Sequence, residues 1–452
     1  MKNFKYISVL ILAVSFVFTS CNDDDDTMEV ILPTQNIVEI AQANGFTSLA
    51  AALTKANLVD ALQTSGKFTV FAPTNEAFDN LLAAIGQTSI DDVPASVLEK
   101  ILLYHVVQGE VMSGDVTAGN VPTLAGENIA LTTAGGIKVN SASVIMPYDV
   151  AATNGVIHTI NEVLVPPTIA PFVNSVLEPA YFSENFTTLI AAAAKANLVD
   201  ALLNTPNLTI FAPTNDAFAA SGLDLNALSA EAIANVLTYH VVGAKVLSSG
   251  IPRDAATLNG AKLWFSLVSS GNFINGDTQI VAVDIESGSG VVHVINKVLL
   301  PPTGNLVETA VALSASGEFT SLVAALTRTA IEGTAAQNLI TVLSGNGPFT
   351  VFAPTNAAFQ ALLDSNPAWN GLGDIPLETL IAVLTYHVVP AKAFDKDVAG
   401  ALDANNMLPT ANGAKLTFDV ANFKINTNTS IIGVNTNASN GVIHVIDKVL
   451  LP

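Results

Sequence analysis

Cysteine is almost absent from this chain, since its 452 residues contain only Cys21. One cysteine excludes an intramolecular disulfide bond, so folded parts must be stabilised by apolar cores, and a chain of this length can bury several. Tryptophan is nearly as scarce, with Trp264 and Trp369 alone. After Phe18 no apolar run reaches eighteen residues, so we expect no membrane-spanning helix there.

Basic residues are also few, with 17 Lys and Arg against 38 Asp and Glu and a formal net charge of −21. So acidic a surface repels phosphate backbones, and we therefore expect no nucleic acid partner. The sequence contains no HExxH, no GxSxG, no glycine-rich phosphate loop and no EF-hand loop. We therefore expect neither enzymatic activity nor a cofactor.

The first residues have the features of a secretory leader. Lys2 and Lys5 precede an apolar run from Ile7 to Phe18, which is too short to anchor a protein in a bilayer. Small residues then lead to Cys21. This arrangement resembles the lipobox of bacterial lipoproteins, although Phe18 stands where leucine is commoner. The resemblance implies a signal peptide over 1–20 and a lipid on Cys21, which would attach the protein to a membrane. A plain signal peptide with an incidental cysteine is the alternative.

An acidic tether over residues 21–33 follows, with the run "NDDDD" from Asn22 to Asp26. A run of like charges is usually solvated. This run also resembles the acidic export signal of bacterial surface lipoproteins. That resemblance implies an outer-membrane lipoprotein exposed on the cell surface, with the periplasmic face as the alternative.

Three phrases recur in order, three times. The phrase "FAPTN" begins at Phe71, Phe211 and Phe352, about 140 residues apart, and each copy is followed by "YHVV" and then by "GVIH" or "GVVH". A period this long is the size of a whole domain. We predict three units, over 34–167, 168–302 and 303–452, and the proline pairs that end the first two predict short, rather rigid joints.

Each unit has the same expected layout. In the first, the segment "FTSLAAALTKANLVDAL" from Phe46 is expected to be one amphipathic helix with an apolar stripe, and "FTVFAP" is a strand ended by Pro73. Thr74 and Asn75 suit a helix N-cap, so "FAPTN" is interpreted as a strand-to-helix corner. Helices that precede a set of strands predict an α+β fold. The structural residues of this corner are Phe71, Pro73, Thr74, Asn75, Phe211, Pro213, Thr214, Asn215, Phe352, Pro354, Thr355 and Asn356.

All six histidines lie in the two later phrases: His105, His158, His240, His293, His387 and His444. A metal or catalytic pair in each unit is one interpretation, but no third ligand or nucleophile recurs with them. The interpretation we favour is a buried, structural role, with each imidazole hydrogen-bonded to the backbone. Tyr104, Tyr239 and Tyr386 are expected to be packed rings with bonded hydroxyls.

Together the three phrases resemble the fasciclin (FAS1) domain family over about residues 35–452. The resemblance implies a β-sheet wedge with helices packed against it, and three tandem copies. It also implies adhesion, because FAS1 domains occur in secreted and surface adhesion proteins, where an Asp-Ile pair before the closing strand and residues around "YH" are implicated in integrin binding.

Carried over by position, the resemblance gives candidate ligand-binding residues in two units. They are Asp149, Val150, Tyr104 and His105 in the first unit, and Asp284, Ile285, Tyr239 and His240 in the second. Unit three has Asn435 and Thr436 in place of the pair, which leaves its role open. A carboxylate that only caps a turn is the structural alternative for Asp149 and Asp284.

Two functional hypotheses follow. The favoured one is a surface lipoprotein that binds an extracellular-matrix or cell-surface protein, with three similar modules that gain from avidity. The other is a glycan-binding accessory lipoprotein of a polysaccharide uptake system. Such a protein needs aromatic platforms, and the two tryptophans, Trp264 in unit two and Trp369 in unit three, provide few.

Overall fold

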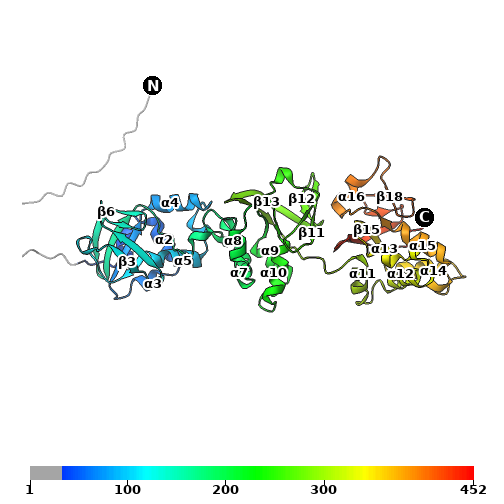
Figure 1. Cartoon of the computed structure of the whole chain (residues 1–452), viewed down its shortest axis with the longest axis horizontal. Helices are drawn as coiled ribbons and strands as arrows, with labels where there is room; N and C mark the ends of the chain where they lie inside the picture. Colours follow the sequence, from blue (N-terminus) through cyan, green and yellow to red (C-terminus); the bar gives the residue numbers. More distant parts are fainter. Residues whose placement is uncertain (1–32) are drawn as a thin grey trace, which may run out of the picture.

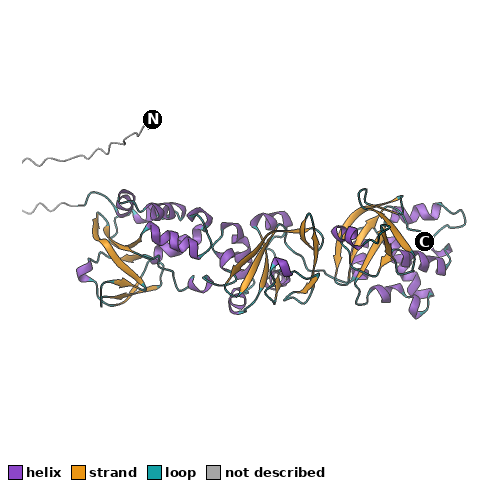
Figure 2. Ribbon diagram, turned by 90° about the horizontal axis from the view of Figure 1, so that it is seen from above, coloured by secondary structure: helices purple, strands orange, loops and turns teal. Residues whose placement is uncertain are grey.

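The computed structural model describes residues 33–452, which form three units in a row along the long axis of the molecule (Figure 1). Each unit contains one seven-stranded sheet with helices packed against it (Figure 2). The α+β fold predicted from the sequence is therefore confirmed. The predicted leader, Cys21 and the acidic run lie outside the described residues.

The first unit begins with helices and ends with strands. Its helices are α1 (Ile37–Ala43), α2 (Thr47–Lys55), α3 (Val59–Leu62), α4 (Asn75–Ala84) and α5 (Ala95–Tyr104). Its strands are β1 (Phe68–Pro73), β2 (Val106–Gln108), β3 (Gly119–Pro122), β4 (Asn128–Thr132), β5 (Lys138–Val139), β6 (Ala142–Ala152) and β7 (Gly155–Ile160).

The other two units repeat this order. Unit two contains α6 (Glu178–Tyr181), α7 (Thr187–Lys195), α8 (Val199–Asn204), β8 (Thr209–Pro213), α9 (Asn215–Ser221), α10 (Ala230–Tyr239), β9 (Val241–Val242), β10 (Asp254–Ala256), β11 (Lys262–Val268), β12 (Gly271–Ile274), β13 (Thr278–Ser287) and β14 (Gly290–Ile295). Unit three contains α11 (Leu306–Ser314), α12 (Thr320–Glu332), α13 (Leu339–Leu343), β15 (Phe349–Pro354), α14 (Asn356–Asp364), α15 (Leu377–Tyr386), β16 (Val388–Val389), α16 (Asp395–Ala401), β17 (Met407–Pro409), β18 (Lys415–Asp419), β19 (Lys424–Ile425), β20 (Thr429–Ala438) and β21 (Gly441–Ile446).

In each sheet the first and last strands of the unit lie side by side. The order in unit one is β2-β1-β7-β6-β5-β4-β3, and β1 runs parallel to β7 while the other pairs are antiparallel. Every residue of β1 and β7 is buried, as expected of interior strands. The parallel pair places Phe71 of the "FAPTN" corner opposite His158 of the closing phrase.

A glycine permits this close pairing. Gly155 has a φ of 150°, and a Cβ at this position would lie 2.0 Å from the carbonyl oxygen of Phe68. Only glycine tolerates both the backbone conformation and the contact. The glycine that opens the closing phrase is thus required where β7 begins to pair with β1.

The helix predicted from Phe46 is broken, which corrects the continuous helix expected from the apolar stripe. Helix α2 ends at Lys55, and α3 begins at Val59. Between them Asn57 adopts a left-handed φ of 56°, and the N–H of Leu58 donates to the carbonyl of Leu53 at 3.0 Å. Asparagine tolerates this conformation, which commonly ends a helix.

The units meet through different faces. Buried apolar residues of units one and two belong to a single continuous cluster, and Lys55 and Glu184 form an ion pair of 3.7 Å across the two units. Figure 1 shows that helices of unit one face helices of unit two, whereas β11 and β12 of unit two face α16 of unit three. Consecutive units are therefore not related by one repeated contact.

Candidate functional site

The first candidate residue, Asp149, lies at an irregularity in β6. The register between β6 and β7 shifts between Ile145 and Val150, and Asp149 has a left-handed φ of 56°. Its carboxylate accepts hydrogen bonds from the backbone N–H of Ser113, at 2.6 Å, and from the Ser113 hydroxyl. The N–H of Asp149 lies 3.4 Å from Nδ1 of His158. Asp149 thus fastens the bulge in β6 to the segment that follows β2.

Unit two repeats this arrangement. Asp284 has a φ of 60°, and its carboxylate accepts hydrogen bonds from the N–H of Ser248, at 2.7 Å, and from the Ser248 hydroxyl. Its own N–H donates to Nδ1 of His293 at 3.2 Å. The carboxylate therefore has a structural role in both units. We call this arrangement, a left-handed Asp or Asn fastened to the segment after the second strand, the bulge lock.

Unit three keeps the bulge lock but exchanges the two partners. Asn435 has a φ of 63°, and the residue in the position of Ser113 and Ser248 is Asp395. The Oδ1 atom of Asn435 accepts from the N–H of Asp395 at 2.9 Å, and its Nδ2 donates to the Asp395 carboxylate at 2.7 Å. The negative charge has moved from the strand to the facing segment, so the departure from Asp at position 435 is compensated.

The two turn carboxylates are ionised at neutral pH. Burial is the largest influence on Asp149 and raises its pKa, but hydrogen bonds from Ser113 and the proximity of His158 outweigh it, so the pKa lies below its ordinary value. For Asp284 the hydrogen bonds from Ser248 are the main cause of a lowered pKa. The Asp149 side chain is 27% exposed, so a partner can still reach it.

Val150 and Ile285 do not stand out into solvent. Both are half-buried and pack against the continuous core of units one and two. Val150 pairs with Ile157 of β7, and Ile285 pairs with Val292 of β14. Each therefore offers a partner only part of its side chain.

The residues exposed beside each bulge lock are apolar, and the sequence reasoning missed them. They stand twelve and ten residues before the second histidine of each unit, on alternate positions of β6, β13 and β20. We call these six side chains the strand patches: Met146 (72% exposed) and Tyr148 (44%), Val281 (54%) and Val283 (41%), and Ile432 (58%) and Val434 (41%). The sequence signal that could have identified them is a strand, outside the buried pair of strands, that carries apolar residues on both of its faces.

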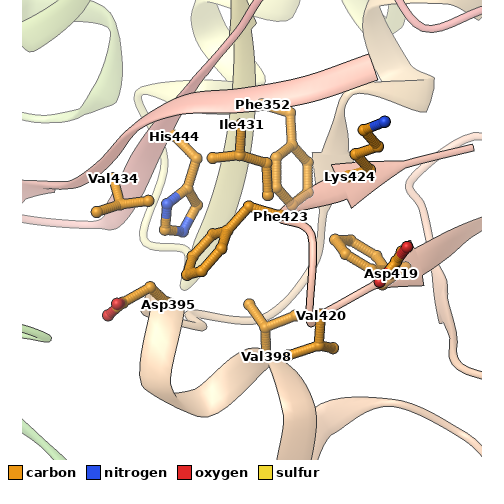
Figure 3. Close-up of a pocket in the computed structure, with 11 residues that line it drawn as sticks. Phe352, Asp395, Val398, Asp419, Val420, Phe423, Lys424, Ile431, Val434 and His444 are labelled. Atoms are coloured by element: carbon orange, nitrogen blue, oxygen red, sulfur yellow. The ribbon is translucent and has the colours of Figure 1, made fainter. Parts of the chain in front are cut away.

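In unit three the strand patch adjoins a small apolar pocket (Figure 3). Val434 and His444 line one side of it, and the ring of Phe423 points into it. Phe423 is 47% exposed and has a φ of 50°. The open volume of about 30 Å³ has room for roughly one water molecule. It is too small for an organic ligand as it stands.

The tyrosines of the "YH" pairs are buried. Tyr104 and Tyr239 are at most 1% exposed. The Tyr104 hydroxyl donates to the carbonyl of Asn128 at 2.9 Å and accepts from Asn140 at 3.1 Å. Tyr239 makes the equivalent bonds with Lys262 and Asn275. They tie the end of a helix to the strands, so neither ring is available to a partner.

The first histidine of each unit is also buried, as expected. His105, His240 and His387 are at most 2% exposed. In His105, Nδ1 lies 2.7 Å from the carbonyl of Ile101 and Nε2 accepts from the N–H of Leu164 at 2.8 Å, and the other two repeat this pattern. Burial lowers the pKa of all three to about 4. They are therefore neutral and bonded to backbone at both ring nitrogens.

The second histidine of each unit supports the bulge lock. The Nε2 atoms of His158, His293 and His444 lie 2.8–2.9 Å from backbone carbonyls of the segment after the second strand. Their rings lie 5.4–5.8 Å, centroid to centroid, from the phenylalanine of the "FAPTN" corner. The closing phrase and the corner thus share one packed contact in each unit.

The "FAPTN" phrase forms the expected corner. Phe71 is 2% exposed, and Pro73 ends β1. Thr74 caps α4 by accepting from the N–H of Ala77 at 3.1 Å. Asn75 bridges to α2 by accepting from the N–H of Ser48 at 3.0 Å. The phrase positions a strand and two helices and exposes little to a ligand.

Neither tryptophan offers an open aromatic platform. Trp264 lies beside Lys392 of unit three, with 5.0 Å between the Nζ atom and the ring centroid. Trp369 packs against the core of unit three. The feature that would have favoured glycan binding is therefore not found in either unit.

Two kinds of feature are absent from residues 33–452. No group of three or more His, Cys, Asp and Glu side chains is placed to hold a metal ion within this range. No helix in the same range is both long and apolar enough to cross a bilayer.

Comparison with known protein families gives one match in each unit. The sequence model described as "Fasciclin domain" matches residues 44–166, 184–301 and 317–452, which is most of the chain. Each match contains one complete seven-stranded sheet. The resemblance noted in the sequence is confirmed.

Several curated proteins are similar to this chain. Transforming growth factor-beta-induced protein ig-h3 of Sus scrofa is 29% identical over 423 residues, which cover 92% of this chain and 57% of that protein. Periostin of Homo sapiens is 28% identical over 429 residues, which cover 91% of this chain and 47% of periostin. The chain thus spans about half the length of these relatives. Protein sll1483 of Synechocystis is 47% identical over 133 residues, which cover 29% of this chain and 73% of that protein.

A solved structure of a FAS1 domain pair from the insect cell adhesion molecule Fasciclin I is also similar. It is 18% identical in sequence, has a TM-score of 0.28, and the likeness covers 59% of this chain and 96% of that one.

Proposed function

Because this chain belongs to the fasciclin domain family, we propose that it is an adhesion protein that binds an extracellular-matrix or cell-surface protein. We take 34–167, 168–302 and 303–452 as its binding units. Its resemblance to adhesion proteins supports the class of function, and the exposed surface beside each bulge lock supports the place of binding.

The observation that carries the proposal is the strand patch of unit one. Met146 and Tyr148 are 72% and 44% exposed, and the ionised carboxylate of Asp149 directly follows them. Exposed apolar side chains next to a fixed charge are typical of protein interaction sites. Because Ser113 and His158 hold the turn, a partner meets a preorganised surface and loses little conformational entropy there.

The "YH" residues contribute by positioning. Tyr104, His105, Tyr239 and His240 are buried, so direct contact with a ligand falls to the strand patches and to Asp149 and Asp284. Val150 and Ile285 hold the backbone of the turn in place and offer the partly exposed remainder of their side chains.

Location at a surface completes the proposal. We propose that Cys21 carries a lipid that anchors the chain in the outer membrane, with the three units on the outside of the cell and the acidic tether as a solvated spacer. With several weak sites on one anchored chain, binding to a matrix gains by avidity.

The proposal is tested with the soluble chain from residue 22 onward and a panel of immobilised matrix proteins and glycans, read by surface plasmon resonance. For a protein that binds, Met146→Ser with Tyr148→Ser should weaken the affinity by roughly tenfold or more, since two partly desolvated apolar contacts are lost. The matched control is Ile331→Ser, because Ile331 is 76% exposed on α12 of unit three.

One further variant tests the carboxylate of unit two. Asp284→Asn should weaken binding to a protein that unit two contacts, because a charge-assisted hydrogen bond between Asp284 and that protein is replaced by a neutral one. Binding to no protein of the panel, or equal losses for Ile331→Ser and the unit-one variant, would contradict the proposal. Selective binding to glycans with no effect of the strand-patch changes would support the glycan-uptake hypothesis instead.

A further inference from the structure

A lysine of unit three is buried against a tryptophan of unit two. Lys392 is 3% exposed. Its Nζ atom lies 5.0 Å from the ring centroid of Trp264 and 5.2 Å from that of Phe394. An ammonium group over aromatic faces is attracted by their π electrons, most strongly where water is excluded. The two units are therefore in contact through a specific pair of side chains.

The hydrogen-bond acceptors of Lys392 are uncharged. Its Nζ atom donates to the side-chain oxygen of Asn437 at 2.6 Å and to the carbonyl of Ala438 at 3.2 Å. Within residues 33–452, no carboxylate oxygen lies within 4.0 Å of it. Burial lowers the pKa of Lys392 to about 7. A buried cation without a counter-ion is costly, and the aromatic contact that unit two supplies favours the charged form of this lysine.

The residues equivalent to Lys392 are Lys245 in unit two and Glu110 in unit one, and each of them forms an ion pair. Lys245 of unit two forms an ion pair with Glu286 at 2.5 Å, and Glu110 of unit one pairs with Lys67 at 2.7 Å. Both pairs are partly exposed. In unit three the position of Glu286 is taken by Asn437, so Lys392 has lost its carboxylate.

Trp264 is equally particular to unit two. Its backbone N–H donates to Asn275, and the residues that make the equivalent bond are Ala130 in unit one and Thr417 in unit three. The tryptophan thus occurs at this position only in unit two, whereas the lysine occurs in units two and three, and it is Lys392 of unit three that contacts Trp264.

A second contact lies beside the first. Gly276 of unit two approaches the bulge lock of unit three so closely that an added Cβ would lie 2.6 Å from Cγ of Asn435 and 2.8 Å from Cδ1 of Phe394. Lys396 of α16 lies over the ring of Phe273, with 5.7 Å to its centroid. Unit two therefore occupies one side of the unit-three turn.

We propose that units two and three are docked as one rigid body by a Lys392–Trp264 clasp, and that this docking closes one side of the bulge lock of unit three to external partners. Among the described residues 33–452, the hydrogen bonds of Asp149 and Asp284 all lie inside their own units. This docking can be measured in the absence of any ligand.

The test measures the distance between the two units in the chain from residue 22 onward, which lacks native cysteine. Spin labels are placed at Asp216→Cys on α9 and Thr327→Cys on α12, which are both exposed helical positions, and distances are read by double electron–electron resonance. We expect one narrow distribution for the otherwise unchanged chain. Trp264→Ala should add a broad component and raise the undocked population roughly tenfold, since a desolvated cation–π contact and buried aromatic area are lost.

Trp264→Ala and Gly276→Ala each have a matched control. Leu267→Ala removes an exposed side chain (50%) from the same strand as Trp264. Gly276→Ala should undock the units by steric clash, whereas Gly260→Ala has the same φ of 91° and meets nothing within 4 Å. Lys392→Met should leave a larger docked population than Trp264→Ala, because it removes the buried charge and retains the apolar contact.

The outcomes are distinct. A narrow distribution that broadens in Trp264→Ala and Gly276→Ala but not in their controls supports the clasp. A broad distribution in the unchanged chain overturns it, and so does a distribution that none of the substitutions alters. If Trp264→Ala fails to fold by circular dichroism, the comparison of Gly276→Ala with Gly260→Ala decides the question.

Discussion

The bulge lock gives a sharp prediction, because two forms of it exist in one chain. Units one and two place the carboxylate on the strand (Asp149 and Asp284), and unit three places it on the facing segment (Asp395). We therefore propose to convert the unit-one lock into the unit-three form in two steps. The single changes are Ser113→Asp and Asp149→Asn, and the double change combines them.

The expected magnitudes follow from the geometry. Ser113→Asp sets two carboxylates face to face. Like charges about 4 Å apart repel by about 4 kcal/mol at an effective dielectric constant of 20, and the partial exposure of Asp149 reduces this to about 2 kcal/mol. Asp149→Asn replaces a charge-assisted pair by a neutral one, at a cost of about 1 kcal/mol. The double variant regains an amide–carboxylate pair, so we expect its stability within about 0.5 kcal/mol of the original.

The assay is urea unfolding of the chain from residue 22 onward, followed by circular dichroism, for the original and the three variants. The quantity of interest is the coupling free energy, which we expect to be about 2–3 kcal/mol in favour of the double variant. The reverse exchange in unit three, Asp395→Ser with Asn435→Asp, is the matched experiment. Additive losses in both units would refute the argument that the two arrangements are equivalent locks.

Three further predictions concern the histidines and the leader. The pKa values of His105, His240 and His387 are about 4 in the folded chain and about 6.5 when unfolded, so their contribution to stability is complete above pH 6.5 and is lost as the pH falls towards 4. As the pH falls through that window, each of these histidines lowers the free energy of unfolding by roughly 1.4 kcal/mol per pH unit. Urea titrations at several pH values will measure this loss. A free energy of unfolding that does not change across the window contradicts buried neutral imidazoles. His158→Ala should lower the melting temperature by several degrees and release no metal, as calorimetry and metal analysis will show; a bound stoichiometric metal in the original protein would disprove the structural role. Cys21→Ser should abolish membrane association and lipid incorporation in fractionated cells, and persistent association refutes the lipid anchor.

Local sequence patterns were sufficient to predict the strand-to-helix corner and its helix caps. Phe71, Pro73 and Thr74 stand within four residues of one another, and their roles depend on neighbours along the chain. Three copies of each phrase, at domain-sized spacing, also determined the number of units and the α+β class. Such features are readable because backbone propensity, capping and periodicity are short-range effects.

The pairing of β1 with β7 and the state of the turn residues were decided only in three dimensions. Asn154, for example, accepts a hydrogen bond from the N–H of Ile37, 117 residues earlier. Asp149 is held by Ser113, 36 residues before it, and no spacing rule predicts which hydroxyl faces which carboxylate. These contacts depend on where the folded backbone brings distant segments together.

Exposure was likewise decided by the tertiary structure. The sequence makes Tyr104, His105 and Asp149 equal candidates for ligand binding. The fold, however, buries the "YH" pair and exposes Met146 and Tyr148 instead. Apolar residues on alternate strand positions look the same in sequence whether a helix, a second unit or water covers them. Which of these covers each face is set by how the sheets, helices and units pack, and the same packing brings Lys392 of unit three against Trp264 of unit two.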